Sequence, residues 1–164
     1  DPRPAGYSGL HRAAGPLGGV WMSAVRTGGC LCGKVRFTAK VKPEINACHC
    51  THCQRWTGGG PLFTVTVEDL EITGEAEIRP YHHSTWGERS VCGTCGATLY
   101  WKMQGRPIAT VAAGLLDDQT GLTVTSEIFV DDRPPWLPPW PGAEQSTEAQ
   151  EMAKLSAFLE GENT

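Results

Sequence analysis

Apolar and polar residues alternate along several short stretches of this chain, and an alternation of period two predicts half-buried β-strands. The clearest alternation covers residues 34–41, and we expect that strand to end at Pro43, because proline has no backbone N–H to give to a sheet. The segment 46–60 is predicted to be a loop. Further short strands are predicted at 62–67, 71–73, 77–79, 98–102, 108–112 and 123–130.

Two segments near the C-terminus break the strand pattern. Residues 131–141 are rich in proline, so we expect an extended strap that lies over the sheet and is anchored by Trp136 and Trp140. After it, Thr147 and Gln150 have the spacing of a capping box, which predicts one helix. The pattern as a whole predicts a mainly β fold of short strands with a C-terminal helix.

The amino-acid composition agrees with this fold and makes some classes of function unfavourable. The 164 residues are the usual size of one domain, and 20 glycines and 12 prolines favour short elements joined by turns. The formal net charge of -4 makes a nucleic-acid partner unfavourable. No apolar run reaches the roughly 18 residues that span a membrane, and we expect no secretory signal.

The chain is expected to divide into three parts. Residues 1–21 are rich in Gly, Pro, Ala and Arg without any period, which predicts a mobile N-terminal extension. The cysteine-containing domain is expected at 22–142, and the C-terminal helix and tail at 143–164.

Seven cysteines stand in three tight clusters. An odd number leaves one thiol over in a closed disulfide framework, and neighbours this close suit a metal ion better than a disulfide. Thiols kept reduced for metal binding indicate the cytoplasm. The ligands that we expect to bind Zn²⁺ are Cys30, Cys32, Cys48, Cys50, Cys53, Cys92 and Cys95.

These cysteines divide as four plus three. Cys30 and Cys32, placed at a strand entry, and the knuckle formed by Cys92 and Cys95 suit a closed structural zinc site. The remaining three leave two alternatives: a second structural zinc whose fourth ligand is His49 or His52, or a site with an open fourth position.

The residues after the middle cluster favour the open site. Arg55 supplies a cation, and Thr57 and Gly58 supply a hydroxyl and an exposed backbone, which together suit a small anionic ligand such as a carboxylate. His49 and His52 are candidate proton carriers.

Three motifs in this order resemble the glutathione-dependent formaldehyde-activating enzyme and centromere protein V family. They are GGCLCGKVRF at 28–37, CHCTHCQRWTG at 48–58 and CGTCGATL at 92–99, and the resemblance covers roughly residues 28–140. It implies an Mss4-like, zinc-containing β fold of short antiparallel strands. It also implies two zinc ions per chain, a structural one at Cys30, Cys32, Cys92 and Cys95, and a catalytic one at Cys48, Cys50 and Cys53.

The activity that the resemblance implies is that of a carbon–sulfur lyase. Glutathione as co-substrate, or another small thiol, would add to formaldehyde to give S-hydroxymethylglutathione, and the reverse would also run. The alternative is a non-enzymatic zinc scaffold that binds a protein or chromatin partner. The scattered basic residues and the negative net charge weigh against chromatin.

Overall fold

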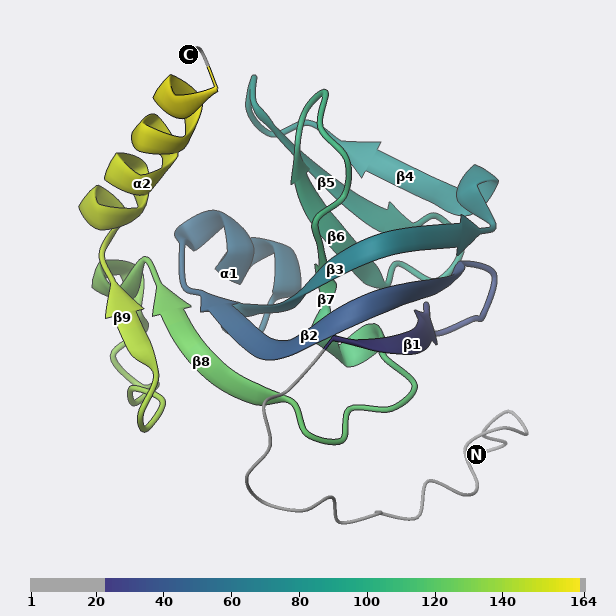
Figure 1. Cartoon of the computed structure of the whole chain (residues 1–164), viewed down its shortest axis with the longest axis horizontal. Helices are drawn as coiled ribbons and strands as arrows, with labels where there is room; N and C mark the ends of the chain where they lie inside the picture. Colours follow the sequence, from purple (N-terminus) through teal and green to yellow (C-terminus); the bar gives the residue numbers. More distant parts are fainter. Residues whose placement is uncertain (1–22, 163–164) are drawn as a thin grey trace.

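The computed structural model describes residues 23–162, so the extension expected at 1–21 lies outside the described residues. The fold is mainly β, with two sheets and two helices, and the C-terminal helix stands at one side of the molecule (Figure 1). The predicted fold class is confirmed. Within 23–162, neither helix is long and apolar enough to cross a membrane.

The larger sheet is built around one long strand, β2 (Arg36–Cys48). Its strand order is β7-β3-β2-β8-β9, and β1 pairs with β2 outside this path. The pairings of β2 with β8 and of β8 with β9 are parallel, and the others are antiparallel. The other strands are β1 (Ala24–Gly29), β3 (Leu62–Thr73), β7 (Thr110–Ala112), β8 (Thr123–Ile128) and β9 (Glu144–Ser146).

The smaller sheet is an antiparallel meander of β4 (Ile78–Tyr81), β5 (Gly87–Cys92) and β6 (Thr98–Met103). It lies against the larger sheet near β3 and β7 (Figure 1). Helix α1 (Thr51–Thr57) connects β2 to β3, and α2 (Glu148–Gly161) follows β9. Three single 3₁₀ turns complete the chain at Glu75–Glu77, Ala113–Leu115 and Val130–Asp132.

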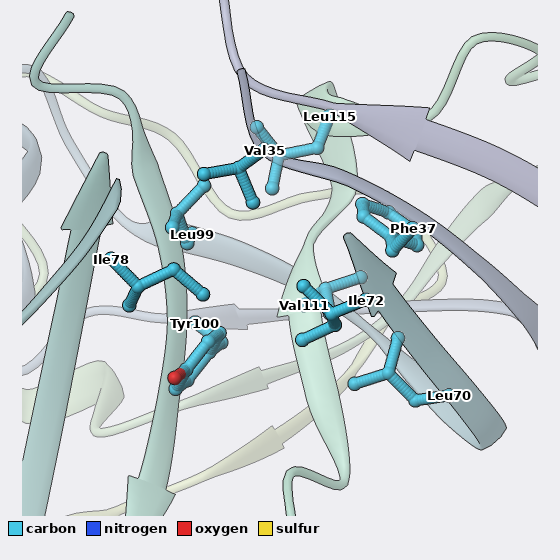
Figure 2. Close-up of a pocket in the computed structure, with 9 residues that line it drawn as sticks. All are labelled: Val35, Phe37, Leu70, Ile72, Ile78, Leu99, Tyr100, Val111 and Leu115. Atoms are coloured by element: carbon cyan, nitrogen blue, oxygen red, sulfur yellow. The ribbon is translucent and has the colours of Figure 1, made fainter. Parts of the chain in front are cut away.

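The main core fills the space between the two sheets. Side chains from both sheets point toward one another there, as Figure 2 shows, and they leave an apolar void of only about 10 Å³. Such close packing is the normal density of a protein interior. The residues around the void are Val35, Phe37, Leu70, Ile72, Ile78, Leu99, Tyr100, Val111 and Leu115.

The expectation that Pro43 ends the first strand was wrong. β2 continues to Cys48, and its register against β3 shifts between Val41 and Ile45, so Pro43 lies at an irregularity where no regular ladder bond is needed. On the other edge of β2, β1 pairs as far as Val41 and β8 begins at Glu44. The proline therefore stands in the gap where β2 changes its neighbour.

The loop predicted at 46–60 was also wrong in part, because it contains the helix α1. The Sγ atom of Cys50 accepts a hydrogen bond from the Cys53 amide (3.4 Å) and caps the first turn. Gly58 adopts a left-handed conformation (φ 73°) and ends the helix. Cysteine is not a usual N-cap residue, which is why the sequence pattern did not reveal the helix.

The Pro-rich segment is not anchored by its tryptophans as expected, because Trp136 is 68% exposed and Trp140 is 48% exposed. A buried carboxylate holds the segment instead. Glu127 of β8 accepts hydrogen bonds from the Trp140 amide (2.9 Å), Gln145 Nε2 (3.1 Å) and Arg133 Nη2 (3.2 Å). Its other oxygen lies 2.8 Å from His49 Nε2.

Glu127 is 3% exposed, so it depends on these partners for its charge. Burial favours the neutral acid, but the Trp140 amide, His49 and the charge of Arg133 outweigh it and lower the pKa of Glu127. One carboxylate thus ties the strap and β9 to the residue that follows β2.

The C-terminal helix begins as predicted, with the capping box of Thr147 and Gln150. None of its residues is buried. The Arg106 guanidinium pairs with Glu162 just after the helix and lies 5.2 Å from the centre of the Phe158 ring.

Replacing Gly74 by alanine should destabilise the protein by about 2 to 4 kcal/mol. Gly74 has a φ of 81°, and an added Cβ would lie 1.8 Å from the Lys34 carbonyl oxygen. Gly114→Ala is the matched control, because nothing lies within 4 Å of its added Cβ and its backbone is not left-handed. Equal free energies of unfolding for the two zinc-loaded variants in chemical denaturation would contradict this expectation.

Substituting Glu127 by glutamine should lower the free energy of unfolding by about 1 to 3 kcal/mol at neutral pH, because Arg133 loses its anion and the other donors lose a charged acceptor. A lowered pKa means that the carboxylate stabilises the fold fully above the unfolded pKa near 4.5 and loses this effect as the pH falls through the folded pKa. The difference in the free energy of unfolding between wild type and variant should therefore become smaller as the pH is lowered. Glu151→Gln, at an exposed pair with Lys154, serves as control and should change stability by at most about 0.5 kcal/mol.

Candidate metal centre

Four cysteine sulfurs meet where the two sheets come together. Cys30 and Cys32 lie in the turn between β1 and β2, Cys92 ends β5, and Cys95 lies in the turn before β6. All four sulfurs are within 4.8 Å of one another, with 3.5 Å between Cys30 and Cys32 and 3.8 Å between Cys32 and Cys92. Zn–S bonds of about 2.3 Å in a tetrahedron place sulfurs about 3.8 Å apart, so these residues fit a four-thiolate zinc ion.

The two turns that carry these cysteines have similar backbones. The Cys30 amide donates to the Val35 carbonyl (3.0 Å), and the Cys92 amide donates to the Ala97 carbonyl (3.0 Å). In each turn the second cysteine is followed by a left-handed glycine, with φ 79° at position 33 and 73° at position 96. Cys30 and Cys32 thus belong to a knuckle like that of Cys92, and not to a strand entry as expected.

Amides and neighbouring thiols favour the charged form of Cys30 and Cys95 in this cluster. Burial opposes ionisation of Cys30, but the Val35 amide (3.3 Å from its sulfur) and the thiols of Cys32 and Cys92 lower its pKa. Burial likewise opposes ionisation of Cys95, and the Ala97 amide and neighbouring groups lower its pKa to about 6. The Lys34 amide favours the thiolate of Cys32, but burial and the other three thiols outweigh it and raise the pKa of Cys32 to about 11. Metal ligands must be thiolates, so a bound ion would have to stabilise this sulfur as an anion.

The other three cysteines form a second cluster at the end of β2. Cys48 is the last residue of β2, Cys50 caps α1, and Cys53 lies in its first turn. Their sulfurs are within 4.8 Å of one another, and in the described part of the chain no histidine or carboxylate joins them. Three sulfurs are one ligand short of the tetrahedral set that zinc takes in closed sites.

The two histidines of this segment lie elsewhere. His49 is completely buried, with Nε2 on Glu127 and with Nδ1 lacking a hydrogen-bond partner. His52 is exposed on α1, and its Nε2 lies 3.3 Å from Nε2 of His83 in the loop after β4. Neither histidine completes the three-sulfur cluster.

The other predicted ligand-binding residues are at the end of α1. Arg55 is exposed in its last turn. The Thr57 hydroxyl lies 3.0 Å from both the Cys53 and the Gly60 carbonyl oxygens, and the Gly58 amide donates to Gln54. Thr57 and Gly58 are thus occupied with ending the helix and shaping the loop.

The cation nearest the second cluster is Arg89, which sequence reasoning missed. Its Nη2 lies 3.6 Å from the Cys53 sulfur, and its guanidinium lies 5.4 Å from the centre of the Trp56 ring. No strand was predicted over residues 87–92, so the sequence did not indicate that Arg89 would lie next to α1. The only signal available was its position three residues before Cys92.

The second cluster concentrates negative charge on one sulfur. Hydrogen bonds from Cys48 and Cys53, the Cys53 amide and the charge of Arg89 outweigh burial and strongly lower the pKa of Cys50. The same hydrogen bonds raise the pKa of Cys48 far above its ordinary value. Without a metal, one thiolate is therefore shared by two thiols. A divalent ion would relieve this competition and let all three sulfurs ionise.

The chain is similar in sequence to a named protein and in structure to a solved one. A protein of Schizosaccharomyces pombe that is named an uncharacterized lyase is 26% identical over 109 residues, which are 65% of this chain and 80% of that protein. A solved structure of a Rhodobacter sphaeroides protein covers 74% of this chain and 99% of its own, at 20% identity and a TM-score of 0.47.

A family match identifies the chain more directly than either of these. Residues 25–132 match the family described as glutathione-dependent formaldehyde-activating enzyme, whose fold is Mss4-like. The matched segment contains both cysteine clusters, and it extends from β1 to the 3₁₀ turn after β8. The chain therefore belongs to the glutathione-dependent formaldehyde-activating enzyme family.

Proposed function

We propose that this protein is a zinc-dependent carbon–sulfur lyase that acts on the adduct of a small thiol, such as glutathione, with an aldehyde such as formaldehyde. In the synthetic direction, a bond forms between the thiol sulfur and the carbonyl carbon. The thiol proton ends on the carbonyl oxygen, so the product is an S-hydroxymethyl thioether and no oxidant is needed. The reverse reaction breaks the same carbon–sulfur bond.

One observation carries this proposal. Cys48, Cys50 and Cys53 form a three-sulfur cluster without a fourth protein ligand among the described residues, in a chain of this family. Catalytic zinc sites have three protein ligands and one exchangeable position, whereas structural sites have four. We assign the structural role to Cys30, Cys32, Cys92 and Cys95, and so expect two zinc ions per chain.

The residues around the three-cysteine cluster supply binding and proton transfer. A zinc ion there would acidify a thiol or polarise a carbonyl at its fourth position. Cys50 and Cys53 are held in place by α1, and Arg55 at its exposed end is suited to bind a substrate carboxylate. His49 is sealed from solvent, so we assign proton exchange with water to the exposed pair of His52 and His83.

The proposed compartment is the cytoplasm. All seven cysteines are free in the structure, and none is paired as a disulfide. Both proposed centres need thiolates, which a reducing compartment preserves.

Replacing Cys50 by serine should remove about one equivalent of zinc and abolish lyase activity while the domain stays folded. The variant loses a ligand of the three-cysteine cluster, which lies at the end of β2 and in the first turn of α1, outside the main hydrophobic core. Metal analysis, circular dichroism and an assay of S-hydroxymethylglutathione formation measure these three effects.

The matched variant is Cys92→Ser, which removes a buried ligand from the four-cysteine cluster between the sheets. It should unfold the protein or lower its melting temperature sharply, because a structural zinc site contributes directly to folding. If Cys50→Ser unfolds the protein as severely as Cys92→Ser does, both sites are structural and the proposed activity is wrong.

Substituting Arg55 by methionine should raise KM for glutathione about tenfold and leave kcat unchanged, because the lost contact is to a part of the substrate that does not react. With 2-mercaptoethanol, which has no carboxylate, the variant should match wild type. Steady-state kinetics with the two thiols tests this. An equal loss with both thiols would show that Arg55 does not recognise a carboxylate.

A further inference from the structure

The guanidinium of Arg89 is buried beside the three-cysteine cluster with part of its hydrogen-bonding capacity unused. Arg89 is 8% exposed, and its Nη2 reaches the Cys53 sulfur at 3.6 Å. Its Nε atom is buried and has no hydrogen-bond partner. Trp56 covers the guanidinium from α1. Among residues 23–162, no carboxylate forms an ion pair with it.

A buried charge of this kind is costly unless an opposite charge lies close to it. The nearest source of negative charge is the cluster itself. A zinc ion with three thiolates carries one net negative charge, so one guanidinium at the Cys53 sulfur makes the site neutral as a whole. Arg89 thus supplies the positive charge that balances the metal-loaded cluster. Among the described residues, no carboxylate pairs with Arg89 in its place.

The same balance decides which ligand the open position accepts. A further anion would bring the cluster to two net negative charges, which a buried site does not tolerate without a cation. A neutral ligand would not change the charge. The hydrogen bond from Arg89 also draws electron density from the Cys53 sulfur. This sulfur would then donate less charge to the metal, which would bind a fourth ligand more strongly.

We propose that Arg89 lets the three-cysteine site accept an anionic sulfur at its fourth position, and that it does so as the buried counter-charge of the metal-loaded cluster. This inference rests on the proposed function and names the residue on which binding of a thiolate depends more strongly than binding of a neutral ligand. An incoming thiol binds through its sulfur and releases its proton to water. Arg55 plays a different part, because it is exposed and faces solvent beyond the cluster.

The origin of Arg89 explains why it is well suited to this role. It comes from β5 of the smaller sheet, whereas all three cysteines come from β2 and α1. β5 is held on one side by β4 and on the other by β6, with Arg89 opposite Tyr81 and Trp101. A side chain on the central strand of a sheet is held by two neighbouring strands, so the position of Arg89 is set from outside the segment that carries the three cysteines.

The experiment uses the folded protein loaded with two equivalents of Co²⁺, whose visible absorption reports thiolate ligation. Only a site with an exchangeable position responds to added ligand. Two probes are titrated into the protein: 2-mercaptoethanol, which binds as an anion and has no carboxylate, and imidazole, which binds as a neutral ligand. The variants are Arg89→Met, Arg89→Lys and the control Arg106→Met, which removes a partly exposed arginine that contacts α2.

Arg89→Met should weaken the binding of 2-mercaptoethanol at least about tenfold and change imidazole binding by less than about twofold. Arg89→Lys should recover part of the lost thiol affinity, because it keeps the charge without the planar fork. Arg106→Met should match wild type for both probes. Circular dichroism and the cobalt stoichiometry confirm that each variant is folded and loaded.

Two results would overturn the inference. An equal loss of both probes in Arg89→Met would mean that the arginine only supports packing, and unchanged binding of both would mean that it has no role at the site. Neither result bears on the lyase activity of the wild-type protein. The proposed function can also fail separately. In that case the wild-type protein binds 2-mercaptoethanol and this binding depends on Arg89, but the protein neither forms nor cleaves the thiol–aldehyde adduct. A wild-type protein that binds imidazole and no thiol would refute both.

Discussion

The convergence of four thiols between the two sheets is the constraint on which the rest of the molecule depends. Cys32 and Cys92 are 60 positions apart in the chain, yet their sulfurs lie 3.8 Å apart. Lys34 and Thr94, on the same two turns, are also hydrogen-bonded. This junction sets how the smaller sheet sits on the larger one. Because Arg89 precedes Cys92 on the same strand, the junction also sets where the guanidinium meets the three-cysteine cluster.

The second cluster is supported from the other end of the fold by β2 and Glu127. β2 begins directly after the first knuckle and ends at Cys48, so one strand connects the two clusters. His49, the next residue, is fixed by Glu127, which also holds the strap and β9. The segment that carries the three cysteines is thus contacted on one side by a buried carboxylate, through His49, and on the other by a buried guanidinium, through the Cys53 sulfur.

The features that sequence reasoning captured are those whose information is local. Cysteine spacing predicted the division into four and three, alternation predicted a mainly β fold, and a capping box predicted α2. Features that depend on distant contacts were missed. Two predicted strands, at 62–67 and 71–73, are one strand, β3, with an irregular residue at Asp69 (φ 51°). The capping of α1 by a cysteine sulfur and the arrival of Arg89 from the other sheet have no local pattern, because each is decided by tertiary packing.

Pro43 has a further consequence for how the molecule behaves among its neighbours. Along one edge of β2, β1 ends and β8 begins, and among the described residues no strand pairs with the short length between them on that side. Unpaired strand edges are the places where chains add to one another and aggregate. A proline in this gap offers no N–H to an incoming strand and resists regular pairing. Pro43, which the sequence pattern predicted to end the strand, thus disfavours the addition of another chain in the middle of β2, the longest strand of the sheet.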